Sequence, residues 1–540
     1  MAHIYRPKHH VRFVTASSLF DGHDASINIM RRILQASGAE VIHLGHNRSA
    51  NEIVNAAIQE DVQGIAVSSY QGGHMEFFKY MYDLLQERGA SHIRIYGGGG
   101  GVIIPREIKE LHEYGIARIF SPEDGRKLGL QGMINVMLEE CDFPTVTEIT
   151  DELERLPKGD VQAIARLITL CESRVDVTNE AATAMETVME KVKELTKPVP
   201  VIGITGTGGS GKSSLTDELV RRFLNEIPDI KIAILSIDPT KQKTGGALLG
   251  DRIRMNSINT PRVYMRSLAT RNSRSELSLA IKDAISVVKA AGFDLIIVET
   301  SGIGQGDAAI TEVCDISMYV MTSEFGAPTQ LEKIDMIDYA DLIVINKFER
   351  KGSEDAKRQV QKQYQRSHQL FDKDLSEMPV YGTIASQFND PGTNTLFVAL
   401  VDLINQKAGT NWKTSLKTVS NVEKHNVIIP SERRYYLREI TETVRNYHKR
   451  VERQVEIARR LFQIEGAIEA AKERGESEDV IASLETLKQH YENELTPESK
   501  RILDSWEDLK AKYSAKQFVT KVRDKEIVTD LTTKSLSGLD

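Results

Sequence analysis

The chain has 540 residues and a mass of 60.4 kDa. That is beyond the ~250–300 residues at which one hydrophobic core stops growing, so at least two domains are expected. Hydrophobic residues make up 40 % and charged residues 27 %, which is ordinary for globular proteins and excludes a disordered chain. With 69 Lys and Arg against 77 Asp and Glu, the formal net charge of −8 disfavours general binding to nucleic acids.

The three cysteines, Cys141, Cys171 and Cys314, lie far apart and form no C-x-x-C pair. Neither a disulfide framework nor a cysteine zinc site is therefore expected, and a reducing cytoplasm is the natural setting. No apolar run approaches the ~20 residues of a membrane span, and the first residues lack an apolar signal core. We expect a cytoplasmic protein without a membrane segment.

Residues 1–141 alternate short β-branched runs with helical patterns. The runs are VRFVTA, VIHLG, GIAVSS and IRIYGG, and the helices fall near 26–37, 50–60 and 75–88. This rhythm predicts a doubly wound α/β domain with about five parallel strands in a flavodoxin-like order. Ligands of such sheets bind at the carboxyl ends of the strands.

Residues 142–196 lose the strand signal and predict a helical connecting arm, with Asp160 as the N-cap before VQAIARLITL. A second βαβ series occupies 197–410 and predicts a second doubly wound domain. It runs through VPVIGITG, KIAILSID, FDLIIVET, ISMYVMTS, DLIVINK and MPVYGTIA.

Residues 411–540 are dense in Glu, Lys and Arg with helical spacing, which is broken near Gly475 and at Thr496-Pro497. They predict an α-helical linker of two or three long helices, followed by a weakly structured tail of ~20 residues.

The most specific motif is G-x-x-x-x-G-K-[ST] at residues 206–213, between a predicted strand and the helical segment SSLTDELVRRFL. That context separates a phosphate-binding P-loop from an ordinary glycine-rich turn. The glycines let backbone N–H groups surround the phosphates, Lys212 reaches the β and γ oxygens, and Ser213 ligates Mg²⁺. The expected nucleotide-binding residues of this motif are Gly206, Gly208, Gly209, Ser210, Gly211, Lys212, Ser213 and Ser214.

Carboxylates follow the P-loop at the ends of two predicted strands. Asp238 ends the first of these strands, with Asp251 and Arg254 downstream, and Glu299-Thr300 ends the second. Alone, each acidic residue is more often a helix cap or part of a solvated loop. Because these carboxylates occur together and follow a P-loop in this order, they favour a site for Mg²⁺ and a nucleotide.

The segment Asn346-Lys347-Phe348-Glu349 follows the apolar strand LIVI. In GTPases the N-K-x-D motif uses its carboxylate to accept two hydrogen bonds from guanine. Glu349 is one methylene longer than Asp, and Ser386 falls where a further base loop is expected. The pattern favours GTP and GDP over adenine nucleotides.

The segments GTGGSGKSS, DPTKQKTGGALLGDRIRM, VETSGIGQ and NKFE together resemble the G-protein chaperones of adenosylcobalamin-dependent acyl-CoA mutases. The arm GDVQAIARLITLCE is similar to the segment before their P-loop. The resemblance implies a GTPase in which Lys212, Ser213 and Glu299 are catalytic and Arg254 meets the phosphates. It implies that Mg²⁺ is met by Ser213, the main chain of Ile237, Asp238, Asp251, Glu299 and Thr300.

In the first domain, the loop after the first predicted strand contains Asp21-Gly22-His23. A neutral imidazole is a good axial metal ligand, and a carboxylate two residues earlier can accept its other ring N–H. Such a pair alone is more often a capping or surface pair. Here Ser68 ends the third predicted strand and five glycines, Gly97 to Gly101, end the fourth, where they permit close approach of a large ligand.

These motifs resemble the D-x-H-x-x-G, S-x-L and G-G motifs of the cobalamin-binding domain of methylmalonyl-CoA-type mutases. The resemblance implies that His23 replaces the cofactor's own dimethylbenzimidazole on cobalt, with Asp21 as its hydrogen-bond partner. It implies a slot for the displaced tail, lined by Ser68, Gly97, Gly98, Gly99, Gly100 and Gly101. Two positions depart from the pattern: Ser26 replaces the usual Gly, and Tyr70 replaces the usual Leu.

A cobalamin module followed by this GTPase resembles the amino-terminal half of the fused isobutyryl-CoA mutases. There the helical linker leads into an acyl-CoA-binding (β/α)₈ barrel, for which we find no strands here. The resemblance implies adenosylcobalamin, GTP or GDP and Mg²⁺ as cofactors, a mutase barrel in cis or in trans as partner, and a homodimer. The complete enzyme would interconvert isobutyryl-CoA and n-butyryl-CoA, with the G domain as chaperone for cofactor loading.

Two alternatives stay open from the sequence. The chain could be a carrier that hands cobalamin to a separate mutase, or a metal-insertion GTPase with an unrelated flavodoxin-like regulatory domain. The latter would be expected to carry Cys or His ligands beside the G domain. We expect no zinc site at His43 and His46, because no Cys or acidic cluster accompanies them.

Overall fold

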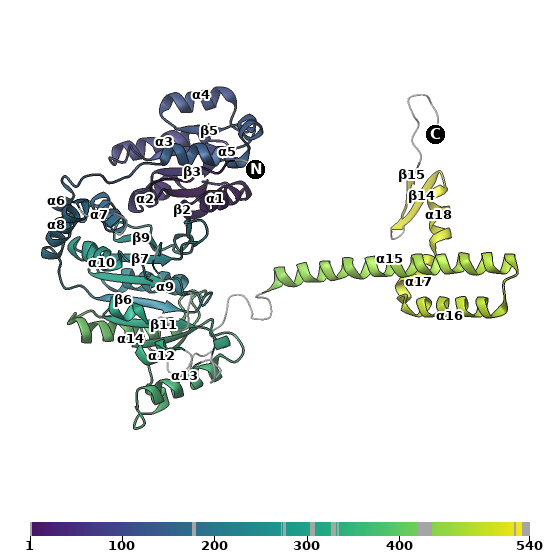
Figure 1. The fold of residues 1–540 in the computed structure, drawn as a ribbon. Coiled ribbons are helices and arrows are strands. Elements are labelled where there is room, and N and C mark those ends of the chain that lie inside the picture. The colour runs from purple at the N-terminus through teal and green to yellow at the C-terminus, as the bar shows by residue number, and fades with distance from the viewer. Residues whose placement is uncertain are drawn as a thin grey trace. The chain divides into compact units, whose positions relative to one another are not determined.

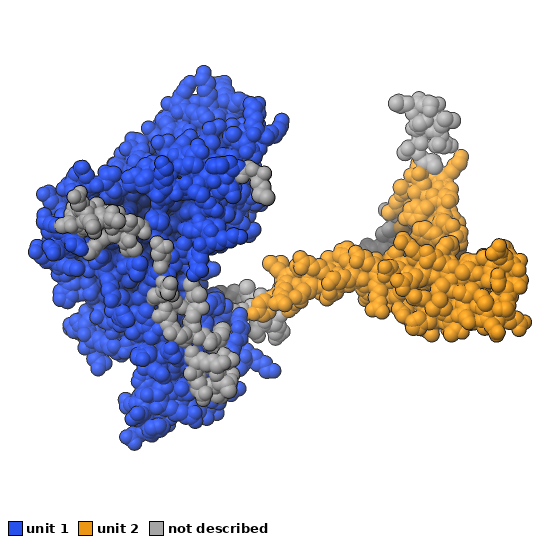
Figure 2. Space-filling model, viewed as in Figure 1, with its two compact units in different colours: residues 1–422 blue, residues 423–540 orange. Residues whose placement is uncertain are grey.

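The computed structural model describes residues 3–174, 180–271, 273, 277–302, 308–325, 331, 334–418, 435–522 and 525–531. The chain divides into two compact units, residues 1–422 and 423–540 (Figure 2). The first unit contains two parallel sheets with their helices, and the second consists of helices and a two-stranded sheet (Figure 1). The predicted pair of α/β domains with a C-terminal helical region is confirmed.

The first sheet has the strand order β5-β4-β3-β1-β2-β8. Its first five strands are β1 (Arg12–Ser18), β2 (Glu40–Arg48), β3 (Gly64–Ser68), β4 (Arg94–Gly98) and β5 (Arg118–Phe120). They pair in parallel and give the flavodoxin-like order that the sequence predicted. Each strand is followed by a helix: α1 (Ala25–Ala36), α2 (Ala50–Gln59), α3 (His74–Glu87), α4 (Pro105–Tyr114) and α5 (Pro122–Cys141).

The sixth strand, β8 (Ala247–Leu249), comes from the second βαβ series and was not predicted. It pairs in parallel with β2, with Ala247 opposite Glu40. Gly246 makes this approach possible, because a Cβ there would lie 2.0 Å from the carbonyl oxygen of Gln35. Three residues carry too little periodicity to identify a strand, so only the fold reveals this pairing.

The connecting arm consists of helices, as expected: α6 (Glu152–Arg155), η1 (Leu156–Lys158), α7 (Val161–Arg174) and α8 (Glu180–Glu194). The Asp160 carboxylate accepts a hydrogen bond from the Ala163 backbone N–H at 2.8 Å. Asp160 is therefore the N-cap of α7, as predicted.

The second sheet has the order β13-β12-β11-β6-β10-β7-β9 and is parallel throughout. Its strands are β6 (Val201–Gly206), β7 (Ile232–Asp238), β9 (Val263–Ala269), β10 (Leu295–Thr300), β11 (Ile316–Met321), β12 (Leu342–Asn346) and β13 (Val380–Thr383). Its α-helices are α9 (Lys212–Glu226), α10 (Ile281–Ala290), α12 (Met336–Tyr339), α13 (Ser353–Ser367) and α14 (Pro391–Ala408). Its 3₁₀ turns are η2 (Arg252–Arg254), η3 (Ala309–Glu312), η4 (Ser323–Phe325) and η5 (Leu375–Glu377).

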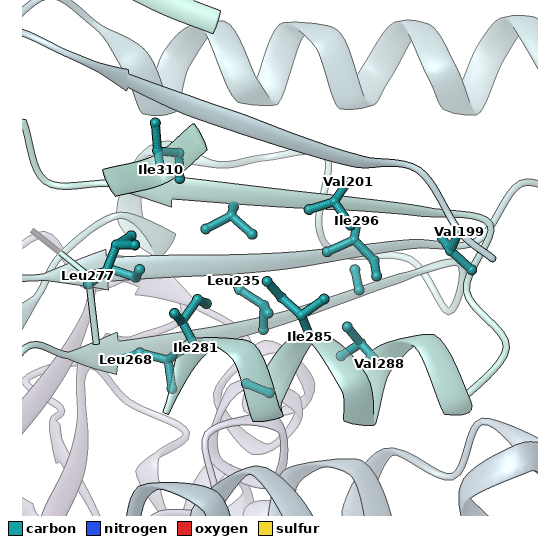
Figure 3. Close-up of a cluster of buried hydrophobic side chains, with 14 of the residues drawn as sticks. Val199, Val201, Leu235, Leu268, Leu277, Ile281, Ile285, Val288, Ile296 and Ile310 are labelled. Atoms are coloured by element: carbon teal, nitrogen blue, oxygen red, sulfur yellow. The ribbon is translucent and has the colours of Figure 1, made fainter. Parts of the chain in front are cut away.

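Apolar side chains cover this sheet on both faces. On one face, Ile281 and Ile285 of α10 belong to the same buried cluster as Leu235 and Ile296 of the strands (Figure 3). On the other, α9 and α14 contribute to a second cluster, in which the rings of Phe223 and Phe397 meet edge to face. Burial on both faces explains why these strands read as continuous apolar runs.

The second unit contains α15 (Tyr436–Arg474), α16 (Glu478–Glu494), α17 (Pro497–Asp504) and α18 (Trp506–Ser514). Gly475 ends α15 with a φ of +70°, and Thr496 caps α17 through the Ser499 backbone N–H, with Pro497 at the first helical position. Both predicted breaks are confirmed. None of the described helices is long and apolar enough to cross a membrane.

The prediction of a weakly structured tail is wrong for the part of the tail up to residue 531 that the structure describes, whereas residues 523–524 and 532–540 lie outside the described ranges. Strands β14 (Gln517–Val522) and β15 (Lys525–Asp530) pair as an antiparallel hairpin. Alternation of apolar and polar residues in QFVTKV and KEIVTD supports these strands, but the signal is short and was outweighed by the charged composition.

Candidate functional site

His23 lies in the loop between β1 and α1, at the carboxyl edge of the first sheet. Its side chain is 69 % exposed, whereas that of Asp21 is fully buried. The Asp21 Oδ1 atom lies 2.9 Å from His23 Nδ1 and accepts the His23 backbone N–H at 2.8 Å. With Nδ1 engaged, Nε2 is the ring nitrogen available to a metal.

The Asp21 carboxylate is itself held in place from the neighbouring strand. Its Oδ2 accepts the Tyr70 backbone N–H at 2.6 Å. Burial alone would raise the pKa of Asp21, but the N–H donors of Tyr70 and His23 outweigh it and hold that pKa below its ordinary value. An ionised partner fixes the imidazole tautomer with its proton on Nδ1, which is what an Nε2 metal ligand requires.

A cavity of about 310 Å³ opens beside this loop. Ser68 and the glycines Gly97, Gly98, Gly99 and Gly100 line it, together with Ser26 and Tyr70. Gly101 lies outside it and lines a separate cavity of about 830 Å³. The exposed imidazole and the adjacent mostly apolar cavity fit a corrinoid that is ligated by His23 and has its tail inserted into the protein.

Two of the glycines are required by the protein's own packing. A Cβ on Gly97 would lie 2.5 Å from the Phe78 ring, and one on Gly99 would lie 2.0 Å from the Ser69 carbonyl oxygen.

Sequence reasoning missed Phe20, which precedes the histidine loop with a φ of +62° and is 80 % exposed. No sequence signal marks such a conformation, because Phe rarely adopts it.

The P-loop connects β6 to α9 in the expected strand–loop–helix context. Gly209 and Gly211 have φ angles of +74° and +90°, which favour glycine. The Lys212 Nζ atom donates to the carbonyl oxygens of Gly206 and Thr207, both at 3.2 Å. Backbone donors, a helix N-terminus and an ammonium group thus converge where phosphates would bind.

Two buried hydroxyl groups of the P-loop, Thr207 Oγ1 and Ser210 Oγ, have no hydrogen-bond partner within the described part of the structure. Gly302 approaches the loop from β10, and a Cβ there would lie 2.0 Å from the Gly206 carbonyl oxygen and 2.3 Å from Lys212 Nζ. No side chain fits at this position, and the residues beyond 302 lie outside the described ranges until 308.

The Ser213 hydroxyl joins two of the predicted acidic residues. Its Oγ lies 2.9 Å from Asp251 Oδ1 and 2.7 Å from Glu299 Oε1, and Thr216 donates to Glu299 Oε2 at 2.9 Å. A hydroxyl has one hydrogen to donate, so Ser213 can donate to only one of the two carboxyl groups at a time. Burial and the nearby Asp251 raise the pKa of Glu299 to about 8.

Asp238 lies at the same edge, where its Oδ2 accepts the Gly250 backbone N–H at 3.0 Å. Burial and Asp251 raise its pKa to about 8. In the described residues, no three Asp, Glu, His or Cys side chains lie close enough to hold a metal alone. Mg²⁺ usually takes only one or two carboxylates and completes its shell with phosphates and water, so the residues fit a nucleotide-dependent Mg²⁺ site.

The other residues of the predicted magnesium set lie close by. Thr300 donates its hydroxyl to Thr205 Oγ1 at 2.7 Å, and Ile237 of β7 pairs in register with Thr300 of β10. The Arg254 side chain is 64 % exposed, with its guanidinium 3.8 Å from Asp251. Arg254 can therefore reach a phosphate without breaking a buried contact.

Asn346 hydrogen-bonds both to the P-loop and to the segment after β13 that is expected to contact the nucleotide base. Its side-chain amide donates to the Ser210 carbonyl at 2.8 Å and accepts the Ala385 backbone N–H at 3.1 Å. Lys347 Nζ donates to the Gly209 carbonyl at 2.8 Å. Glu349 and Ser386 are exposed on the segments that follow β12 and β13, at this same edge of the sheet.

A buried cluster of charged groups, which sequence reasoning missed, joins the two sheets of the first unit. Glu60, at the end of α2, pairs with Arg252 at 2.7 Å, and Arg252 directly follows Asp251 of the nucleotide site. Burial would raise the pKa of Glu40, but Arg271 and Arg12 outweigh it and hold that pKa well below its ordinary value. Charged residues distant in sequence give no local signal of such a cluster, whose members are Arg12, Glu40, Glu60, Glu172, Arg252, Arg266 and Arg271.

Fold and site together define a P-loop nucleotide-binding protein joined to a flavodoxin-like domain with an exposed, carboxylate-held histidine. Comparison with protein families makes this specific. Residues 164–474 match the family described as methylmalonyl Co-A mutase-associated GTPase MeaB, and the chain belongs to that family. Residues 11–125 match the B12 binding domain, so the chain carries a B12-binding domain and a GTPase domain.

Similarity over nearly the whole of this chain extends to proteins named fused isobutyryl-CoA mutase. The chain is 89 % identical to that of Geobacillus kaustophilus over 541 aligned residues, covering 100 % of this chain and 50 % of the relative. It is 53 % identical to that of Cupriavidus metallidurans, covering 98 % of this chain and 48 % of the relative. It is 49 % identical to that of Nocardia farcinica, covering 99 % of this chain and 49 % of the relative. The chain thus spans about half the length of these curated relatives.

Proposed function

We propose that this chain is the cofactor-binding and GTP-hydrolysing portion of an isobutyryl-CoA mutase, which acts with an acyl-CoA-binding barrel. The observation that carries the proposal is His23, an exposed imidazole whose Nδ1 is held 2.9 Å from a buried carboxylate beside a cavity of about 310 Å³. The similarity to fused isobutyryl-CoA mutases over the whole chain supports the acyl-CoA specificity.

Adenosylcobalamin, when bound, supplies the radical chemistry of the rearrangement. The chain's own residues bind and orient it. His23 would offer Nε2 to the cobalt, Asp21 holds the ring and its tautomer, and Ser68 with the glycines of β4 borders the cavity that would take the nucleotide tail.

In the GTPase domain, the P-loop binds the phosphates and Lys212 balances their charge. Ser213, Asp251 and Glu299 would hold Mg²⁺, whose positive charge would offset the cost of burying these carboxyl groups close together. Glu349 selects guanine. GTP turnover then governs the loading of intact cofactor, in an assembly that we propose to be a homodimer.

The test is an absorption titration of the purified chain with adenosylcobalamin. We expect the spectrum of a histidine-ligated corrinoid, and we expect His23→Ala to weaken binding or leave cobalt without an imidazole. His448→Ala, at an exposed histidine of α15, is the matched control and should behave as the unchanged chain. An unchanged spectrum in His23→Ala contradicts the assignment.

A second experiment separates a mutase portion from a cobalamin carrier. The loaded chain is mixed with a separately produced acyl-CoA-binding barrel, and conversion of isobutyryl-CoA is followed. Turnover supports the mutase assignment. Transfer of cobalamin to another apo-mutase without turnover supports the carrier.

Nucleotide selectivity is measured as the affinity of the chain for GTP and for ATP. Equal affinity for the two nucleotides would contradict the role of Glu349.

A further inference from the structure

The two positions that depart from the cobalamin-domain pattern contact each other. Ser26 lies in the first turn of α1, and Tyr70 follows β3 after Ser69. The Ser26 Oγ and Tyr70 OH atoms lie 2.7 Å apart, within hydrogen-bond distance. A glycine at the first position and a leucine at the second could not form this bond, because neither side chain has a polar atom.

Both side chains line the cavity of about 310 Å³. Ser26 approaches it from α1 and Tyr70 from the end of β3. On the glycine side, a Cβ at Gly100 would lie 3.1 Å from the Tyr70 ring. The Tyr70 ring therefore fills space between the helix and the glycine segment.

Tyr70 also reaches the histidine loop. Its ring centroid lies 5.6 Å from that of His23, and its backbone N–H binds the Asp21 carboxylate at 2.6 Å. A ligand that is held by His23 and also enters the cavity must therefore pass beside Tyr70. The other hydroxyl groups lining the cavity are engaged by the fold: Ser68 with Ser17 at 3.0 Å, Tyr96 with Glu140 at 2.8 Å and Ser121 with Asp124 at 2.7 Å.

We infer that the Ser26–Tyr70 hydrogen bond is a latch across the entrance of this cavity, and that it makes the chain discriminate between corrinoids by their nucleotide tail. A corrinoid with a tail must break the latch to enter. A corrinoid without one binds His23 and leaves the latch closed. The inference rests on the proposed corrinoid site and names the residues that set its selectivity.

The experiment measures dissociation constants for two probes, aquacobalamin and the tail-less diaquacobinamide. Tyr70→Phe and Ser26→Ala each remove one hydroxyl and keep the rest of the cavity. We expect each to tighten aquacobalamin binding about fivefold, the worth of one neutral hydrogen bond, and to leave diaquacobinamide binding unchanged. The double variant should bind no more tightly than either single variant, because both remove the same bond.

Tyr114→Phe is the matched control, since it removes a phenolic hydroxyl that binds Asp83 at 2.9 Å on the surface. It should change neither constant. The inference is overturned if Tyr70→Phe leaves aquacobalamin binding unchanged or weaker, or if it shifts both probes equally. Failure of the unchanged chain to bind either probe would instead overturn the proposed corrinoid site, so the two failures are distinguishable. Tyr70→Phe keeps the aromatic ring, so the test stands even if Ser26→Ala does not fold.

Discussion

At the scale of single residues, the two candidate sites are built on the same principle. His23 is exposed and Ser213 is buried, but in both cases a buried carboxyl group lies within hydrogen-bond distance of the functional group and orients it. Asp21 does this for His23, and Glu299 does it for Ser213. Each carboxyl group has further hydrogen-bond partners, Tyr70 in the first case and Thr216 in the second.

Lys212→Ala should lower GTP hydrolysis by ~10²–10³-fold, because it removes the cation that stabilises charge on the phosphates. Corrinoid binding should be unchanged, since His23 belongs to the other sheet. Hydrolysis is followed by phosphate release, and binding by absorbance. The control is Lys231→Ala, at an exposed lysine just before β7. Residual hydrolysis near the normal rate would contradict the assignment of Lys212.

His43 makes stability depend on pH. It is 6 % exposed, and its Nδ1 lies 2.9 Å from Thr15 Oγ1. Burial, together with Arg31, lowers its pKa from 6.5 to about 4, so the unfolded chain binds this proton first as the pH falls. The resulting stability is fully present above pH ~6.5, and about 3 kcal/mol of it is lost as the pH falls to ~4.

Denaturant unfolding of the full chain between pH 7 and pH 4 measures this loss. His43→Gln cannot titrate and should flatten the dependence across that window. A dependence as steep as that of the unchanged chain would assign the effect to other groups.

At the scale of elements, helix α15 contains one glycine and ends at another, and the two have opposite roles. Gly466 lies inside the helix, whereas Gly475 ends it with a φ of +70°. A Cβ added at either position meets no atom within 4 Å. Any difference between the two alanine variants therefore reports backbone conformation alone.

Gly475→Ala should destabilise the second unit by about 1 kcal/mol, because alanine is strained in the left-handed region. Gly466→Ala should stabilise it by about 0.5–1 kcal/mol, because alanine favours a helix interior. Hydrogen exchange of α15 and α16 amides in the full chain measures both. Equal effects of the same sign would contradict the capping role of Gly475.

At the scale of the whole molecule, a strand from the chain segment that forms the second sheet completes the first sheet. Strand β8 completes the first sheet beside β2, and Asp251 follows it after one intervening residue. Arg252 then enters the buried ion cluster through Glu60, 2.7 Å away. The position of Asp251, which we propose as a magnesium ligand, is therefore coupled to the packing of the B12-binding domain.

Gly246→Ala tests this coupling. Its Cβ would lie 2.0 Å from the carbonyl oxygen of Gln35 at the end of α1, so the start of β8 must shift. We expect the Mg²⁺ concentration for half-maximal GTP hydrolysis to rise several-fold, because Asp251 moves with the strand. Gly72→Ala, where a Cβ meets nothing within 4 Å, is the control and should leave it unchanged. An unchanged Mg²⁺ requirement in Gly246→Ala would show that the strand and the metal site move independently.

The sequence by itself determined the features that depend on neighbouring residues. Periodicity identified the flavodoxin-like domain and six strands of the second sheet, and local motifs identified the P-loop, the Asp160 cap and the breaks at Gly475 and Thr496. Strand β9 was not predicted because Arg266 interrupts its apolar pattern, and this buried guanidinium is stabilised by residues distant in the sequence, among them Glu172 at 2.6 Å and Thr169 at 3.0 Å.

Only the tertiary structure decided the contacts between residues far apart in the chain. The pairing of β8 with β2, the Glu60–Arg252 ion pair and the Ser26–Tyr70 hydrogen bond each join segments with no local relation. The physical reason is that helix and strand patterns report which face of a segment is buried. What that face, or a buried charge, meets is set by the packing of the whole chain.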